Sequence, residues 1–164
     1  MLSERVEWRV GWGSDVHRLE VGEGLWLGGV FLPCQLKSIS VSDGDVLLHA
    51  IVDAVLGAGG LGDIGDHFPE SAVKQGERSS LFLEQTVEML AAKGGAVVNA
   101  DCVVDLERPK LGGFKPVVRD NVAALLRIAP ERVNIKAKTG EGLGIIGTGA
   151  AIGAQAVVMV RLPV

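Results

Sequence analysis

Two histidines and an aspartate stand at spacings that allow them to share one metal ion. Asp15 and His17 lie two residues apart in a segment, Glu7 to His17, whose side chains alternate as in a strand. Both side chains are therefore expected to leave the same face. His49 lies in a segment with helical periodicity that starts at Asp45. One carboxylate and two imidazoles, with a fourth position open, are a typical donor set for a catalytic zinc ion.

Each part of this donor set also has a purely structural interpretation. An Asp-x-His sequence is common on surface strands, and Asp45, His49 and Asp53 are spaced to form one solvated helix face. In the functional interpretation, the two carboxylates flank His49 and orient it for a metal. Asp43 is expected to cap the same helix, because its side chain can accept a hydrogen bond from the first turn.

Two glycine-rich segments carry further candidate residues. Asp63 lies between glycines in the segment Gly57 to Pro69, where the backbone can approach a ligand closely. The alternative is that Asp63 makes an Asx-turn that only ends the preceding helix. Glu141 follows a Lys-Thr pair in a second glycine-rich turn. Its carboxylate suits a hard cation, such as Mg²⁺, that also holds phosphate oxygens.

Composition limits the class of protein. The 164 residues suit one domain, 1–164, with a sizeable core. Hydrophobic residues make up 48%, and the mean hydropathy of +0.33 indicates apolar surface buried between subunits. A net charge of −4 without a basic block argues against nucleic-acid binding. The apolar runs are too short to cross a membrane, and residues 1–5 do not resemble a signal peptide, so we expect a cytoplasmic protein.

The remaining segments supply the elements that must position these residues. Periodicity and Gly/Pro punctuation predict strands, two helices, a strand, a helix and two strands, in that order. This order indicates an α+β domain whose helices lie on one face of a sheet. The predicted strands are 7–17, 24–32, 96–106, 133–138 and 151–162, and the predicted helices run from Asp45 to about Gly57, over 79–93 and over 115–128.

Five motifs follow one another along the chain in an order typical of one enzyme family. They are Gly11-Trp12-Gly13-Ser14-Asp15-Val16-His17, Ser42-Asp43-Gly44-Asp45 with His49, Leu61-Gly62-Asp63-Ile64-Gly65 with Phe68-Pro69, Arg108-Pro109-Lys110, and Asn134-Ile135-Lys136-Ala137 with Thr139 and Glu141. With these motifs the chain resembles the 2-C-methyl-D-erythritol 2,4-cyclodiphosphate synthase family of the non-mevalonate isoprenoid pathway. The resemblance extends from Gly11 to the last strand.

The resemblance implies a homotrimer. Each subunit would have a ferredoxin-like α+β fold with a mixed sheet, three sheets would enclose a central cavity, and active sites would lie between neighbouring subunits. The implied reaction is the attack of the 2-phosphate of 4-diphosphocytidyl-2-C-methyl-D-erythritol 2-phosphate on its β-phosphorus, with loss of CMP. The nucleophile is already an anion, so the enzyme must mainly bring two anions together and neutralise them.

The resemblance also implies roles for particular residues. By position, Asp15, His17 and His49 correspond to the zinc ligands, and Glu141 to the ligand of a second ion, Mg²⁺ or Mn²⁺. Thr139 corresponds to a transition-state stabiliser. The implied substrate-binding residues are Asp63, Ile64 and Gly65 for the methylerythritol hydroxyls; Leu106, Pro109, Lys110, Leu111 and Gly112 for cytidine; Lys138, Thr139, Gly140 and Glu141 for the diphosphate; and in addition Val41, Ser42, Phe68 and Ile145.

The chain departs from the family pattern at four of these or nearby positions. Val41 stands where the family usually has a histidine that contacts the substrate, and the loss of such a donor would cost on the order of a hundredfold in rate. Lys138 replaces a usual threonine and could help to hold phosphate. Thr148 and Ala150 replace an arginine and a glutamate near the trimer axis. We therefore expect a central cavity without an anion site.

Two other functions compete with an active synthase. One is a trimeric module that binds zinc and a cytidine nucleotide but turns over poorly, as Val41 suggests. The other is a metal-dependent phosphohydrolase that uses water. The three metal-type residues together with Glu141 favour catalysis, and the cytidine-type loop and the lack of a candidate general base disfavour the hydrolase. The expected partners are a small cytidine diphosphate ester and two further copies of the chain, with no nucleic acid and no membrane.

Overall fold

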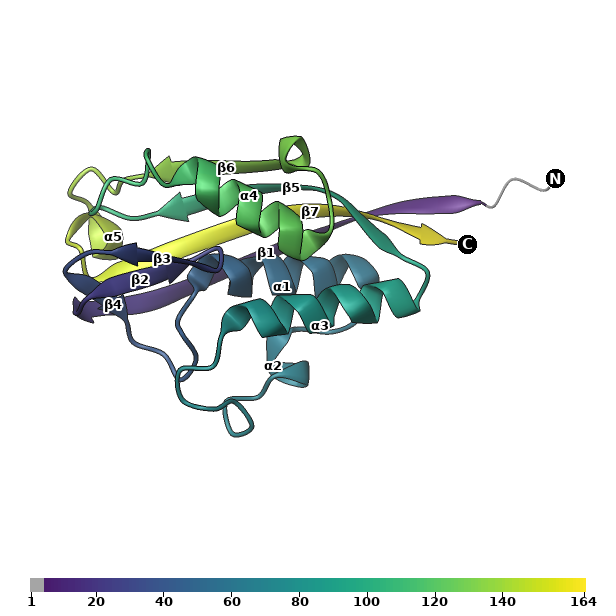
Figure 1. Ribbon diagram of the computed structural model, residues 1–164, viewed down its shortest axis with the longest axis horizontal. Coiled ribbons are helices and arrows are strands. Elements are labelled where there is room, and N and C mark those ends of the chain that lie inside the picture. The colour runs from purple at the N-terminus through teal and green to yellow at the C-terminus, as the bar shows by residue number, and fades with distance from the viewer. Residues whose placement is uncertain (1–4) are drawn as a thin grey trace.

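A mixed sheet of five strands forms the frame of the molecule (Figure 1). The computed structural model describes residues 5–164, so residues 1–4, on which the expectation about a signal peptide partly rests, lie outside the described residues. The strands are β1 (Val6–Val21), β2 (Gly24–Leu27), β3 (Val30–Pro33), β4 (Leu36–Ser38), β5 (Ala96–Asp105), β6 (Val133–Lys138) and β7 (Ala151–Pro163). The helices are α1 (Val46–Gly59), α2 (Ile64–His67), α3 (Ser79–Ala92), α4 (Lys115–Leu126) and α5 (Gly144–Gly147), with a 3₁₀ turn at Pro130–Arg132.

The strand order in the large sheet is β4-β1-β7-β5-β6, and β2 and β3 form a separate hairpin. β5 and β6 run parallel, whereas β1 pairs antiparallel with both β4 and β7, and β5 pairs antiparallel with β7. The long pair β1 and β7 brings the beginning and the end of the chain together, with Val6 opposite Pro163. The predicted mixed α+β fold is confirmed.

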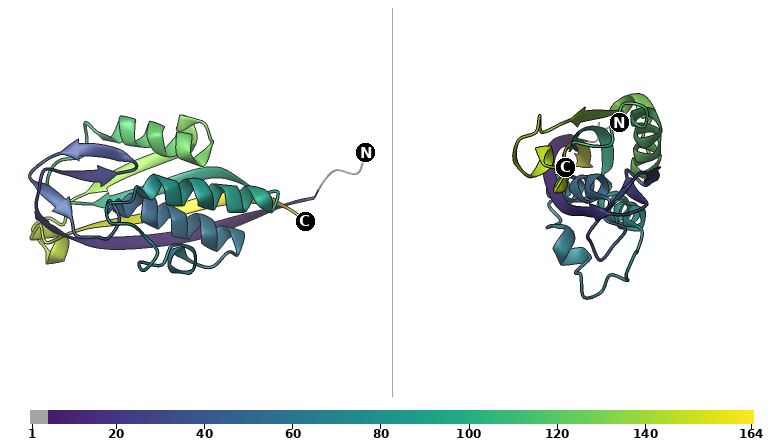
Figure 2. Two further views of the ribbon diagram at one scale, coloured as in Figure 1. Left: turned by 60° about the horizontal axis from the view of Figure 1, so that its bottom comes forward. Right: turned by 90° about the vertical axis from the view of Figure 1, so that its left-hand side faces the viewer.

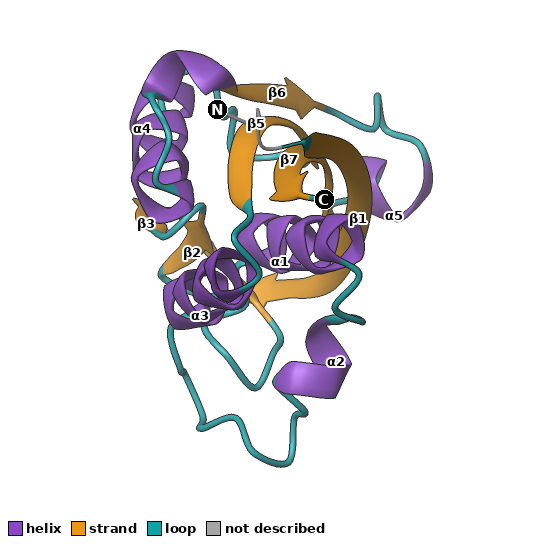
Figure 3. Cartoon of the chain, turned by 90° about the vertical axis from the view of Figure 1, so that its right-hand side faces the viewer, coloured by secondary structure: helices purple, strands orange, loops and turns teal. Residues whose placement is uncertain are grey.

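Helix α1 is the central element of the core. Eleven of its residues are buried, on every side except the stripe of His49, Asp53 and Gly57. A helix that is apolar around most of its circumference must be covered there, and α1 packs on β1 and β7 with one side and on α3 with another. Figure 2 shows α1 and α3 running side by side, and Figure 3 shows α1, α3 and α4 gathered on one side of the curved sheet.

Two glycines allow α1 to lie unusually close to β1. A Cβ atom added at Gly11 would lie 1.8 Å from the carbonyl oxygen of Ala54, and one added at Gly13 would lie 2.1 Å from that of Ala50. These neighbours are helix backbone and cannot move aside as a side chain can. The absence of a side chain at both positions therefore sets the distance between strand and helix.

The side chains of β1 alternate between a face that packs against α1 and a face that is exposed. Gly11 and Gly13 face α1, and the same alternation turns Asp15 and His17 toward the beginning of that helix. On the opposite face, the side chains of Trp8 and Trp12 stay 59% and 62% exposed. Solvent rarely contacts large apolar side chains this regularly in a monomer, so this face of the sheet is suited to contact with another surface.

Most predicted elements are confirmed, but the strand predicted as 7–17 continues to Val21, and the short elements β4, α2 and α5 were not predicted. The segment predicted as one strand over 24–32 is a hairpin of two short strands with a turn at Gly28 and Gly29. Helix α1 is capped by Asp45, whose side chain accepts from the amide of Leu48, and not by Asp43. Among residues 5–164, none of the helices has the length and apolar character needed to span a membrane.

The contact between β1 and α1 predicts opposite effects for two glycine-to-alanine substitutions. Gly11→Ala should lower the free energy of unfolding by about 1–3 kcal/mol, because the new methyl group overpacks against helix backbone. Gly57→Ala should raise it by about 0.5–1 kcal/mol, because Gly57 lies in α1 with open space around it. Urea denaturation at one protein concentration measures both, and equal effects would contradict the proposed packing constraint.

Candidate metal centre and substrate pocket

Asp15, His17 and His49 meet at one point between β1 and α1. Asp15 Oδ2 lies 2.9 Å from His49 Nδ1 and 3.2 Å from His17 Nε2, and the two ring nitrogens are 3.1 Å apart. Ligands at about 2.0–2.1 Å from a tetrahedral zinc ion are about 3.3 Å from one another. The triangle of donor atoms therefore fits a divalent metal ion. Within residues 5–164, no second group of three His, Cys, Asp or Glu residues meets in this way.

Burial lowers the pKa of His17 and so favours the neutral ring that a metal site needs. Removal from solvent is the largest influence on His17 and lowers its pKa, while the charge of Asp15 acts in the opposite direction and that of His49 lowers the pKa further. The ring is therefore neutral at neutral pH, and a neutral imidazole is the form that binds a metal.

The position of His49 depends on how α1 begins. Asp45 is fully buried, and its carboxylate accepts hydrogen bonds from the amides of Leu48 (3.0 Å), Gly28 (2.9 Å) and Gly29 (2.6 Å). These bonds tie the first turn of α1 to the β2–β3 turn and so fix where His49 emerges. Burial raises the pKa of Asp45, and the backbone donors oppose this effect.

The predicted support of His49 by Asp45 and Asp53 is wrong. Asp45 is engaged with backbone amides, and Asp53 accepts a hydrogen bond from the amide of Ile64 at 2.8 Å. The other ring nitrogen of His49, Nε2, instead lies 2.8 Å from Ser79 Oγ and 3.3 Å from Ser42 Oγ. Helical spacing places residues on one side of a helix but does not show which of them neighbouring elements will engage. Ser79 is 30 positions away along the chain, so spacing within α1 gave no sign of it.

A pocket of about 280 Å³ opens beside the three donor atoms. Five of the predicted substrate-binding residues line it, namely Val41, Ser42, Ile64, Gly65 and Phe68. Sequence reasoning missed the lining residues Ser40, Glu70, Val73 and Phe82, and it had named Asp53 only as a support of His49. Phe82 stacks between Phe68 and His49, with ring centroids at 4.8 and 6.2 Å. The pocket thus combines polar groups at the donor atoms with an aromatic wall.

Asp63 does not end the preceding helix, as one interpretation held, but begins the next one. Its carboxylate accepts from the amide of Asp66 at 3.0 Å, and the Asp66 carboxylate accepts from the amide of Asp63 at 3.2 Å. This reciprocal capping box holds the short helix α2. Burial raises the pKa of Asp53, which anchors the same segment through Ile64.

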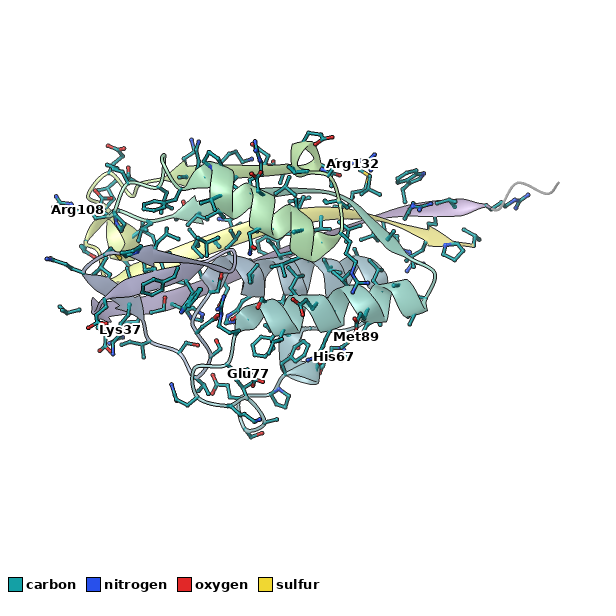
Figure 4. All side chains as sticks on the ribbon, in the orientation of Figure 1. Lys37, His67, Glu77, Met89, Arg108 and Arg132 are labelled. Carbon is teal, nitrogen blue, oxygen red and sulfur yellow. The ribbon has the colours of Figure 1, made fainter. Side chains whose placement is uncertain are left out.

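Asp63 itself does not line the pocket, and the remaining predicted substrate-binding residues form a second group away from it. The amide of Leu106 donates to the carbonyl of Lys138 at 2.9 Å, and that of Gly140 donates to Glu107 Oε2 at 3.0 Å. These bonds join the two predicted loops at one end of the sheet. In Figure 4, Arg108 lies at this end and the labelled His67, beside α2, lies well away from it.

Within residues 5–164, no member of this second group lines the pocket beside the donor atoms. It comprises Leu106, Pro109, Lys110, Leu111, Gly112, Lys138, Thr139, Gly140, Glu141 and Ile145. Thr139 Oγ1 donates to Glu141 Oε1 at 2.7 Å, and Glu141 has a φ of 50°, in the left-handed region. One copy of the chain therefore carries two separate halves of the predicted site.

Comparisons with known proteins agree on one family. A model of the YgbB family matches residues 8–161. A Treponema denticola protein named 2-C-methyl-D-erythritol 2,4-cyclodiphosphate synthase is 48% identical over 149 residues, covering 90% of this chain and 92% of that protein. The bifunctional IspDF from Campylobacter jejuni has a TM-score of 0.91 and 35% identity, covering 96% of this chain and 43% of that one. A 2C-methyl-D-erythritol-2,4-cyclodiphosphate synthase in a CDP-bound form has a TM-score of 0.85 and 39% identity, covering 93% and 99%.

The geometry predicts that His49→Ala removes the bound metal but not the fold. Only 11% of the His49 side chain is exposed, but its ring is part of the pocket wall and not of the apolar core. Zinc content per chain should fall from near one to near zero, while circular dichroism and the apparent mass stay unchanged. His67→Ala is the matched control, because its ring lies outside the donor set and contacts the carbonyl of Leu61. An unfolded His49→Ala variant would mean that the metal is structural.

Proposed function

The chain belongs to the YgbB family, and we propose that, like its relatives named 2-C-methyl-D-erythritol 2,4-cyclodiphosphate synthase, it cyclises 4-diphosphocytidyl-2-C-methyl-D-erythritol 2-phosphate. An oxygen of the 2-phosphate forms a bond to the β-phosphorus, the bond from this phosphorus to the bridging oxygen breaks, and CMP leaves with that oxygen. The product is 2-C-methyl-D-erythritol 2,4-cyclodiphosphate, so the enzyme is a phosphorus–oxygen lyase. The observation that carries the proposal is the convergence of Asp15, His17 and His49 beside a pocket lined by Ile64 and Gly65.

Asp15, His17 and His49 would hold a zinc ion or a similar divalent ion. When bound, such an ion supplies positive charge that polarises a phosphate oxygen and offsets the charge that develops during the transfer. Glu141, in the second half of the site, would hold a second ion, Mg²⁺ or Mn²⁺. Lys138 and Thr139 would then lie beside the diphosphate, the lysine as a cation and the threonine as a hydroxyl donor to the transition state.

The remaining residues would bind and orient the substrate. Residues 63–65 would contact the methylerythritol hydroxyls, and 106–112 would bind the cytidine through backbone groups. Holding the 2-phosphate and the β-phosphorus in line removes the entropy cost of their encounter, which can account for about 7 kcal/mol or more of the barrier.

A complete site needs both halves, so the halves of neighbouring copies would come together at the subunit boundary. The exposed apolar face of β1, with Trp8, Val10 and Trp12, supports an assembly in which sheets face one another. We therefore infer a homotrimer of ferredoxin-like subunits around a central cavity that lacks an anion site. The single synthase domain over residues 1–164 and the cytoplasmic location stay predictions.

The product of the reaction separates the candidate functions. Incubation with the substrate and Mg²⁺ should yield CMP and the cyclic diphosphate, both identified by phosphorus NMR. Asp53 and Glu70 line the pocket, so carboxylates that could activate water are present and the hydrolase must be tested directly. CMP together with a linear phosphate would indicate hydrolysis. Tight binding of CDP without release of CMP would indicate a binding module.

Val41 predicts a gain of activity on substitution. Val41 lines the pocket and carries no donor, whereas a histidine there could donate to the transition state. Val41→His should raise kcat by up to about a hundredfold, the usual contribution of one well-placed donor. Val73→His is the matched control, because Val73 lines the same pocket but is not one of the predicted substrate-binding residues. Equal effects of the two substitutions would show that the position of the donor does not matter.

A further inference from the structure

Ser79 links the metal-type residue His49 to a buried carboxylate. Its hydroxyl is fully buried at the start of α3, 2.8 Å from Nε2 of His49. The same hydroxyl donates to Oδ1 of Asp43 through a short hydrogen bond. Three elements thus meet at this oxygen: α1 through the histidine, α3 through the serine, and the segment before α1 through the aspartate.

The chemistry of the three groups sets the direction of both hydrogen bonds. An ionised carboxylate can only accept, so the single hydroxyl proton of Ser79 points to Asp43. The serine oxygen then offers only lone pairs to His49, whose Nε2 must carry the proton and donate. An imidazole that binds a metal is neutral and has one ring proton, so Nδ1 keeps its lone pair for the metal. Nδ1 is the atom that lies 2.9 Å from Asp15 and 3.1 Å from His17.

Asp43 is held firmly enough to impose this direction. Its side chain is 2% exposed, and Oδ2 accepts from Arg78 Nε and from the Ser79 amide, both at 3.1 Å. Arg78 is itself fixed, because it donates to the carbonyl of Gly29 at 3.0 Å and lies 3.5 Å above the ring of Trp26. The β2–β3 hairpin therefore supports the carboxylate through Arg78.

We propose that Ser79 and Asp43 are positioning residues that hold His49 as the Nδ1 ligand of the metal. Together they select the tautomer, orient the ring and increase the electron density at the ligating nitrogen. This inference rests on the proposed metal centre and deepens it.

A purely structural role makes a different prediction. Asp43 also accepts from the backbone of α3, so the contact helps to begin that helix. If this were its whole purpose, substitution would lower the stability of the metal-free protein and leave the intrinsic affinity for metal unchanged. The test must therefore measure both quantities.

The test compares Ser79→Ala with Ser80→Ala, its neighbour in α3, in the full chain. Zinc affinity is measured by chelator competition, and the stability of the metal-free protein by thermal unfolding. We expect Ser79→Ala to bind zinc about 10–100-fold more weakly than the parent, with Ser80→Ala unchanged. Asp43→Asn should weaken binding in the same direction, because the amide leaves one acceptor oxygen for the donors that surround it. Equal zinc affinity of Ser79→Ala and the parent would overturn the proposal, as would a loss of affinity matched by unfolding of the metal-free variant.

A spectroscopic measurement tests the tautomer itself. In the Co²⁺-loaded parent, proton NMR should show a hyperfine-shifted, solvent-exchangeable N–H signal from His49 that is absent in His49→Ala. In Ser79→Ala this proton loses its 2.8 Å partner and keeps only the longer contact to Ser42 Oγ at 3.3 Å, so it should exchange much faster. An unchanged signal would overturn the proposed role of Ser79 and Asp43.

These readouts do not depend on turnover. A parent that binds zinc but forms no cyclic product would refute the proposed reaction, but not the positioning role of Ser79 and Asp43. If the parent forms the product and Ser79→Ala binds zinc as tightly as the parent, only the positioning role of Ser79 and Asp43 is refuted.

Discussion

The close approach of α1 to β1 is the constraint on which the rest of the structure depends. Gly11 and Gly13 leave no side chains between strand and helix, so helix backbone lies almost directly on strand backbone. Asp15 lies two residues beyond Gly13 on the same face of β1, and its side chain contacts His49 there. A wider separation of the two elements would still allow a core to form, but the carboxylate and the two imidazoles would no longer share one point.

Two buried carboxylates lie beside this contact, and several hydrogen-bond donors offset the free energy that their burial costs. Asp45 begins α1 and holds the β2–β3 turn, while Asp43, two residues earlier, holds α3 and Ser79. Buried carboxylates are stabilising only when such donors surround them. Four elements are thereby tied to one short segment, which positions His49 more precisely than packing of apolar side chains alone would.

Periodicity carried most of the fold prediction, because each long element has one clear pattern. Alternation in 7–17 and helical spacing after Asp45 depend only on local geometry, and both are confirmed. The errors arose where a residue had several available partners. Asp43 and Asp45 are equally good caps by composition, and the choice between them depended on the β2–β3 turn, whose amides engage Asp45. No spacing rule contains that information.

The sequence by itself determined the donor set, because an Asp-x-His on one face of a strand and a histidine near the start of a helix are local features. Its high apolar content also predicted that apolar surface is buried between subunits. Only the tertiary structure decided that the donor atoms lie within about 3 Å of one another, that Ser79 supports His49, and that the two halves of the predicted site lie apart in one copy of the chain. These facts depend on contacts between residues distant in sequence, and such contacts form only when elements with separately determined shapes pack together.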